Sequence, residues 1–177
     1  MSFQNKLPIK LARLSFPSLF KTAVFQGEST GKYEATFLLD KTTDAKQIAH
    51  LQNAAQEFLV DKFGEGKIPK GIKLTCFADG DTKDTAGYEN QIALKGSSTR
   101  RIMVLNNDKT PLAEEDNVIY AGCYVNAFIG FWYSDHPKGG KQLLCNILGV
   151  QFAKAGASFG DGVIDVTDDF DEIEDEF

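Results

Sequence analysis

The chain has 177 residues, of which 42% are hydrophobic, and a formal net charge of −6 at pH 7. This length and composition predict one domain with a single buried core. No run approaches the roughly 18 apolar residues of a membrane span, and the N-terminus lacks the pattern of a secretory signal. Cys76, Cys123 and Cys145 have no paired spacing, so we expect reduced core thiols in a cytoplasmic protein rather than a disulfide framework.

The first part of the chain predicts two strands joined by a loop. Residues 10–16 alternate as in a strand, and Pro17 ends its regular pairing because proline has no backbone donor. The loop over 17–31 is rich in Phe and Lys. Residues 32–39 predict the second strand, and one of its faces carries Tyr33, Ala35, Phe37 and Leu39.

A helix is predicted next. Asp44 can cap its first turn, with Gln47 reaching back from three residues later. Gly64 ends the helix, as glycine commonly does at a C-terminus. Between them, apolar residues recur at helical spacing, which indicates core packing rather than a cofactor site; they are Ile48, Leu51, Ala55, Phe58, Leu59 and Phe63.

The middle of the chain returns to strands. Residues 71–77 alternate in polarity and predict a strand, after which 79–90 form a polar loop. Residues 91–95 and 100–105 predict a hairpin, closed by the turn at 96–99.

The longest predicted strand covers residues 118–133, and the last strand covers 141–153. Successive strands with one helix after the second, and without a repeating strand–helix unit, predict a small antiparallel barrel. The leading candidate is a mainly β, five-stranded OB-fold. We therefore assign residues 1–155 to an OB-fold domain and 156–177 to a disordered acidic tail.

The strand over 118–133 has two different faces, because side chains alternate between the sides of a strand. Odd positions from 121 to 131 are small or apolar, as in a barrel interior. Even positions carry rings, interrupted by one amide and two glycines; they are Tyr120, Gly122, Tyr124, Asn126, Phe128, Gly130 and Trp132. This outer face predicts a platform for unpaired bases, since stacking contributes about 1–3 kcal/mol per base whatever the sequence.

Basic residues accompany these rings near the loops over 17–31 and 134–140, which would border the oligonucleotide cleft of an OB-fold. Such residues contact phosphates and make binding salt-dependent. A single ring in a strand is more typical of packing, so the prediction depends on the group. The predicted contacts to single-stranded DNA are Phe16, Phe20, Lys21, Tyr33, Lys73, Phe77, Arg100, Tyr124, Phe128, Trp132, Lys138 and Lys141.

Acidity is concentrated at the end of the chain. Nine of the 25 Asp and Glu residues lie in 161–177, so residues 1–160 hold 16 acidic and all 19 basic residues, about +3. This block is typical of an interaction tail. Tethered beside a cationic cleft, it can also compete for that cleft, because short tethers give millimolar effective concentrations. The predicted partner-binding residues are Phe170, Ile173, Asp175, Glu176 and Phe177.

Four stretches of the sequence are recognisable: ARLSFPSLF at 12–20, YEATFLL at 33–39, YAGCYVN at 120–126 and LGVQF at 148–152. Together they resemble the phage-encoded single-stranded-DNA-binding proteins formerly grouped as a domain of unknown function. The resemblance implies one OB-fold with a helix after the second strand and an acidic tail ending in Phe. It also implies coating of single strands during replication and recombination in the host cytoplasm, and contacts of the tail with replication proteins such as DNA polymerase.

The sequence does not predict an enzyme. His50 and His136 stand in no nucleophile arrangement, and there is no phosphate-binding glycine loop or paired cysteine spacing. Asp79, Asp81 and Asp84 miss the calcium-loop spacing and are interpreted as a polar turn. We therefore expect no cofactor and no metal.

Two other functions are compatible with the sequence. One is a protein-interaction module or nucleic-acid mimic that acts through the tail, which deletion of 161–177 would separate from DNA binding. The other is a binder of single-stranded RNA, which competition between RNA and DNA would identify. We expect a monomer or a homodimer.

Overall fold

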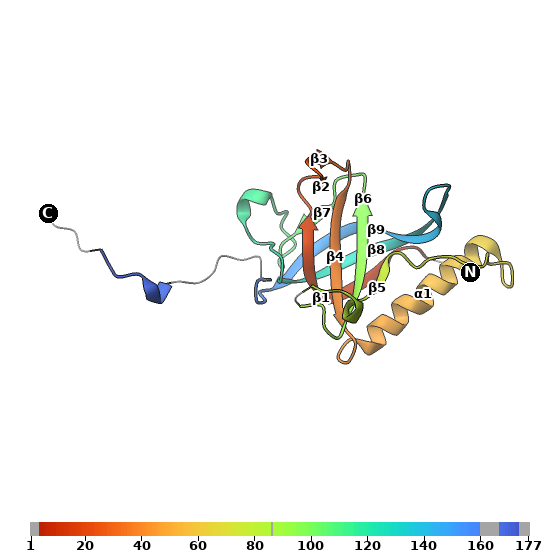
Figure 1. Cartoon of the computed structure of the whole chain (residues 1–177), viewed down its shortest axis with the longest axis horizontal. Helices are drawn as coiled ribbons and strands as arrows, with labels where there is room; N and C mark the ends of the chain where they lie inside the picture. Colours follow the sequence, from red (N-terminus) through yellow and green to blue (C-terminus); the bar gives the residue numbers. More distant parts are fainter. Residues whose placement is uncertain (1–3, 86, 160–166, 174–177) are drawn as a thin grey trace.

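A computed structural model describes residues 4–85, 87–159 and 167–173. It shows a β-barrel with one long helix, α1 (Ala45–Phe63), at its lower end (Figure 1). The described chain also contains three short 3₁₀ helices, η1 (Gly80–Thr82), η2 (Glu114–Asp116) and η3 (Thr167–Asp169). The strands are β1 (Leu7–Ser18), β2 (Val24–Phe25), β3 (Glu28–Ser29), β4 (Tyr33–Asp40), β5 (Phe77–Asp79), β6 (Gln91–Ser98), β7 (Met103–Leu105), β8 (Tyr124–His136) and β9 (Gly140–Lys154).

Five strands close the barrel. Antiparallel pairs run in the order β6, β4, β1, β8 and β9, and a parallel pair between Ser97 of β6 and Asn146 of β9 joins the two ends. The short strands β5 and β7 extend the sheet by pairing with β6 and β9. This is the pairing of an OB-fold, with α1 between the second and third barrel strands, so the predicted fold class is confirmed.

Alternation along the barrel strands produces the core. Every second residue of β8 from Val125 to Phe131 is buried, as predicted for the odd-numbered face. Helix α1 packs against the end of this face, where the ring centroids of Phe58 and Phe131 are 6.3 Å apart and those of Phe63 and Tyr133 are 5.0 Å apart. The helix therefore closes the barrel from below. None of the described helices combines the length and the hydrophobicity required of a membrane span.

Two predicted features of the middle segment are wrong. Residues 71–77 do not form a strand, because a turn at Thr75 and Cys76 interrupts it; Lys73 makes one bridge to β9, and β5 begins only at Phe77. The predicted hairpin of 91–95 with 100–105 does not form either. Both edges of β6 are used by barrel partners, and β7 instead pairs in parallel with β9.

Other predicted boundaries shift. The strand predicted from 118 begins at Tyr124 and continues to His136, and the loop over 17–31 contains the short β2–β3 hairpin. Helix α1 ends before Gly64 as predicted, with φ +95° at the glycine. The predicted capping box is wrong, because the Gln47 amide exchanges two hydrogen bonds with the main chain of Lys10, at 2.6 and 3.0 Å.

The three cysteines are free and buried, as predicted. Burial raises the pKa of the Cys76 thiol to about 12 and raises the pKa values of Cys123 and Cys145 as well. Because the thiolate is the reactive form of cysteine, these side chains serve as packing groups in the folded protein.

Candidate nucleic-acid interface

Strands β1, β4 and β6 form one side of the barrel, in front of β8 and β9 in Figure 1. Side chains that point away from the barrel interior lie in rows across these strands. Strand pairing sets these rows, because each residue of β1 lies opposite one of β4, which lies opposite one of β6. We call two of them the front face: the lower row Arg13–Leu38–Ala93 and the upper row Ser15–Thr36–Lys95. Four of these six residues are buried, and Lys95 alone is exposed; the buried residues are Ser15, Thr36, Leu38 and Ala93.

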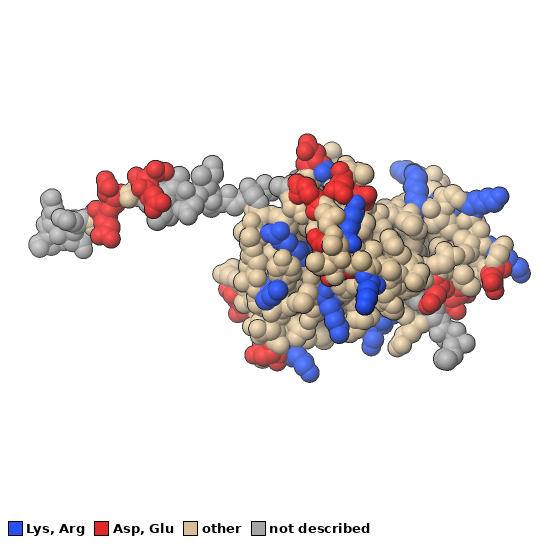
Figure 2. Space-filling view, turned by 90° about the horizontal axis from the view of Figure 1, so that it is seen from below, with Lys and Arg blue, Asp and Glu red and all other residues tan. Residues whose placement is uncertain are grey.

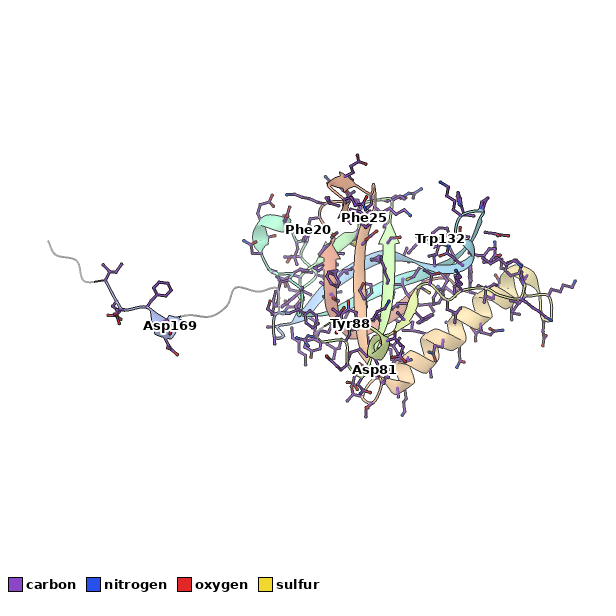
Figure 3. The ribbon with its side chains drawn as sticks, in the orientation of Figure 1. Phe20, Phe25, Asp81, Tyr88, Trp132 and Asp169 are labelled. Atoms are coloured by element: carbon purple, nitrogen blue, oxygen red, sulfur yellow. The ribbon has the colours of Figure 1, made fainter. Side chains whose placement is uncertain are left out.

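A cavity of about 320 Å³ opens at the upper end of the front face and is lined by residues including Phe16, Val24 and Lys95. A bulge in β1 between Ser15 and Ser18 gives Phe16 a φ of +46° and leaves its ring 61% exposed. Phe25 lies in the β2–β3 hairpin at the upper end of the barrel (Figure 3). The Phe16 ring and the Lys95 side chain thus line one cavity, together with Glu34, beside the loop that borders an OB-fold cleft.

A second group of predicted contacts gathers at the β8–β9 hairpin. The Lys73 amide donates to the Lys141 carbonyl at 2.9 Å, and the Leu143 amide donates to the Lys73 carbonyl at 2.8 Å. Lys138 lies in the hairpin turn, where its amide donates to His136 Nδ1 at 3.2 Å. The structure therefore makes the main chains of Lys73 and Lys141 neighbours, with Lys138 in the adjoining turn. Because Lys73 forms its bridge with Gln142, its side chain lies on the face of Gln142, whereas Lys141 Nζ donates to the Lys70 carbonyl at 3.4 Å.

The two groups lie on adjoining segments. The Lys95 amide of β6 donates to the Cys76 carbonyl at 2.9 Å, three residues after Lys73. The Thr75 hydroxyl donates to the Gln142 side-chain oxygen at 2.8 Å, which ties the same segment to β9. We call this line of neighbouring segments, from the β2–β3 hairpin over Lys95 to the β8–β9 hairpin, the path.

The rings predicted on β8 do not form one platform, so this part of the prediction is wrong. Bulges at Tyr124/Val125 and Phe128/Ile129 interrupt the register of β8 with β9. Tyr124 lines a cavity of about 320 Å³ together with Arg13 and Lys154. Phe128 is 46% exposed and lines a different cavity, of about 300 Å³, beside Met103. Twist and bulges turn successive rings toward different surroundings.

Trp132 lies toward the β8–β9 hairpin end of the barrel (Figure 3) and is partly buried. Its indole Nε1 is buried and has no hydrogen-bond partner among the described residues. Tyr120 and Gly122, which the prediction placed on the same strand, precede β8.

Several predicted contacts have partners of their own. The Phe77 ring centroid is 6.0 Å from that of Phe131, and Phe20 and Tyr33 pack, partly buried, against the core. The Lys21 ammonium lies 3.4 Å from the Glu114 carboxylate, with both groups exposed. Arg100 is exposed in the turn after β6, where its amide donates to the Ser98 hydroxyl at 3.1 Å.

The sequence analysis missed Arg13, Phe25, Tyr88 and Lys95. Lys95 could have been found, because it lies between buried Leu94 and Gly96 of a strand and must therefore point outward. Tyr88 had no local signal. It comes from the loop over 79–90, and its hydroxyl lies 2.7 Å from the Ser15 hydroxyl on the front face.

An ionic network holds the loop that carries Tyr88. Lys41 Nζ lies 2.6 Å from Asp79 Oδ1 and 2.7 Å from Asp81 Oδ2. The Asn90 amide donates to the other oxygen of Asp81 at 2.9 Å. These bonds lower the pKa values of both carboxyls and raise the pKa of Lys41. Across residues 4–85, 87–159 and 167–173, no group of three or more His, Cys, Asp or Glu side chains is placed to hold a metal ion.

Charge is distributed unevenly over the described chain. The charged side chains of the 167–173 segment are all acidic, whereas the body carries Lys and Arg side chains together with clusters of Asp and Glu (Figure 2). Within that segment Phe170 is 75% exposed and Ile173 is 94% exposed. The other predicted partner-binding residues, Asp175, Glu176 and Phe177, lie outside the described residues.

Comparison with known proteins gives consistent matches. The sequence model of a family described as the ssDNA-binding protein of Enterobacter phage Enc34 matches residues 5–177. Protein p50 of Acyrthosiphon pisum secondary endosymbiont phage 1 is 31% identical over 176 residues, which cover 95% of this chain and 94% of p50.

Solved structures agree with the family match. The single-stranded DNA-binding protein of bacteriophage Enc34, in complex with ssDNA, has a TM-score of 0.76 at 25% identity and covers 88% of this chain and 90% of its own. The single-stranded DNA-binding protein gp2.5 of bacteriophage T7 shares the fold, with a TM-score of 0.59 at 12% identity over 94% of this chain and 95% of its own. The resemblance stated from the sequence is confirmed, and the chain belongs to the family of the Enterobacter phage Enc34 ssDNA-binding protein.

Proposed function

We propose that this protein binds single-stranded DNA without regard to sequence and protects it during phage replication and recombination. The observation that supports this most is the path from Phe16 and Lys95 to Lys73, which ends at the β8–β9 hairpin with Lys138 and Lys141. Unpaired bases require ring faces, and their phosphates require positive charge. The Enc34 relative is described in a complex with ssDNA, which supports the same ligand here.

In this proposal bases stack on the exposed rings of Phe16 and Phe25, and phosphates follow Lys95 toward the β8–β9 hairpin. Phe16 and Phe25 are 61% and 68% exposed, so a base can reach them without displacing core side chains. Trp132, Tyr124 and Phe128 stay proposed contacts for a longer strand that continues around β8. The proposed place of action is the host cytoplasm, with the protein acting as a monomer or a homodimer.

The ring contacts are tested by the double variant Phe16→Ala/Phe25→Ala in a titration of labelled oligo-dT followed by fluorescence anisotropy. We expect binding to weaken about tenfold or more, because each stacked base contributes about 1–3 kcal/mol. Lys95→Ala should lower the slope of log K against log salt by about 0.7, the value for one phosphate contact on a single strand.

Gln52→Ala is the control, since Gln52 is exposed on α1, which contributes no residue to the path or to the proposed contacts on β8. Equal affinities for the double variant and the control would contradict the proposed path. Competition by oligo-U decides between DNA and RNA as the preferred strand.

We further propose that the acidic tail competes with DNA for this path and recruits replication proteins such as DNA polymerase. The tail carries nine carboxylates in residues 161–177, whereas the remainder of the chain has an excess of basic residues. Exposed Phe170 and Ile173 are suited to an apolar pocket on a partner.

Removal of residues 161–177 should tighten oligo-dT binding at low salt, because the competing polyanion is lost. The increase in affinity should become smaller at higher salt, because salt screens the attraction between the acidic tail and the basic residues of the barrel. Titrations at 50 and 300 mM salt would measure this change. A truncated protein with equal or weaker affinity at low salt would contradict the competition. In that case the proposed role of the tail would be limited to binding protein partners.

A further inference from the structure

The chain folds back against the barrel after β9. The Tyr120 hydroxyl donates to the Gly156 carbonyl at 2.8 Å and accepts from the Gly156 amide at 3.0 Å. Arg13 Nη2 donates to the Ala157 carbonyl at 2.5 Å, and the Phe159 amide donates to the Ala121 carbonyl at 3.2 Å. These bonds direct residue 159 onto the lower row of the front face.

The Phe159 ring occupies a slot there. The Arg13 guanidinium carbon lies 4.0 Å from the ring centroid, the distance of a close cation–π contact. The ring packs beside the buried cluster of Leu38, Tyr88 and Ala93. Gly87 lies at the edge of the ring. A Cβ atom added at this residue would be 2.2 Å from Phe159 Cε1, so a side chain does not fit there. The slot is therefore fitted to a flat ring between a guanidinium and a residue without a side chain.

A nucleobase meets the same requirements. Arg guanidinium planes stack on unpaired bases as they do on aromatic side chains, and the apolar floor of Leu38 and Ala93 favours a ring of either kind. Arg13 lies in the row next to that of Lys95, so the slot adjoins the proposed path. The cavity lined by Arg13, Tyr124 and Lys154 continues beyond it, with Lys154 Nζ 5.0 Å from the Tyr124 ring.

We propose that the slot between Arg13, Gly87 and Tyr88 is a nucleobase subsite, and that Phe159 fills it in the DNA-free protein. This inference rests on the proposed single-stranded DNA binding and adds a specific position to it. A base that enters the slot displaces the Phe159 ring. Because residue 159 lies just before the nine carboxylates of 161–177, occupation of the subsite also releases the segment from which this acidic block extends.

The affinity test uses Phe159→Ala in the full chain. Only molecules with an empty slot can accept a base there, so removal of the competing ring should tighten oligo-dT binding. We expect the affinity for oligo-dT to rise about two- to fivefold, which is the factor that corresponds to the strength of an exposed cation–π contact. Arg13→Ala, which removes the stacking surface for base and phenyl ring alike, should weaken binding. Gln52→Ala again serves as the control.

The displacement can be measured directly by tryptophan fluorescence in the double variant Trp132→Phe/Phe159→Trp, which places an indole in the slot. The first change keeps a ring at 132 and leaves the indole at 159 as the only tryptophan. Saturating oligo-dT should shift its emission to longer wavelength, since the indole moves from the slot into water. The matched control is Trp132→Phe/Gln52→Trp, in which no shift is expected because Gln52 is exposed on α1, which has no residue in the front face.

The outcomes separate the two proposals. Suppose that anisotropy shows oligo-dT binding while the emission of the indole at 159 is unchanged. Residue 159 then stays in the slot when DNA is bound, which contradicts the subsite proposal but not the proposal of DNA binding. If wild-type protein does not bind oligo-dT, both proposals fail. If Phe159→Ala lacks the circular dichroism of the folded protein, the emission experiment alone decides.

Discussion

Replacing Phe131 by alanine is expected to lower the free energy of unfolding by about 3–5 kcal/mol, the cost of deleting a fully buried phenyl ring. Phe131 is 1% exposed, and its ring lies 6.3 Å from Phe58 of α1 and 6.0 Å from Phe77 of β5, measured between centroids. One side chain thus joins the helix, the short strand and the barrel. The cavity left by alanine would open among three elements that cannot all collapse into it.

Urea denaturation followed by far-UV circular dichroism measures this loss. Phe128→Ala is the matched control, because Phe128 is on the same strand and 46% exposed on the opposite face. We expect the control to change stability by less than about 1 kcal/mol. Similar losses for the two variants would mean that Phe131 does not organise the core as its contacts indicate.

Sequence reasoning was most successful where a pattern is local. The alternation of residues 125–131 and the helical stripe from Ile48 to Leu59 both predicted buried faces, which the structure confirms. These patterns depend only on the repeat of a strand or a helix, and so they can be read from neighbouring residues. Together with the element order they were sufficient to predict the OB-fold.

Pairing between distant segments could not be predicted in this way. Turn residues at 96–99 indicated a hairpin, but closure of the barrel gives β6 other partners on both edges. The same limitation applies to the site. Lys73 joins Lys141 only because the 73–76 segment fills the space between β6 and β9, and no spacing in the sequence encodes that contact.

Bulges in β1 and β8 explain why the sequence did not predict which surface each aromatic ring faces. In a regular strand Phe16 would share the inward face of Ala12 and Leu14, both of which are fully buried. The bulge after Ser15 turns its ring outward instead. On β8 the corresponding irregularities separate Tyr124 from Phe128. The path proposed for DNA therefore runs over several elements, from the β2–β3 hairpin over β6 to the β8–β9 hairpin, rather than along the outer face of β8 alone.

Gly80→Ala tests whether the loop that carries Tyr88 is positioned by close main-chain packing. A Cβ at residue 80 would come within 2.1 Å of the Tyr88 carbonyl oxygen and 2.7 Å of the Gln91 carbonyl oxygen. Neither atom belongs to a side chain that can rotate away, so the loop itself must move. We expect a loss of about 1–3 kcal/mol in the free energy of unfolding, as for other overpacked sites.

The same displacement should reach the front face. Tyr88 is bonded to Ser15 at 2.7 Å and helps to form the slot of Phe159, so a shifted loop loosens both contacts. Gly149→Ala is the control, because its nearest neighbour would be the Met103 carbonyl oxygen at 3.6 Å, an ordinary contact. Urea midpoints and oligo-dT affinities of the two variants supply the measurement. Unchanged stability in Gly80→Ala would show that the loop adapts freely, and that the ionic network of Lys41 rather than close packing determines where Tyr88 lies.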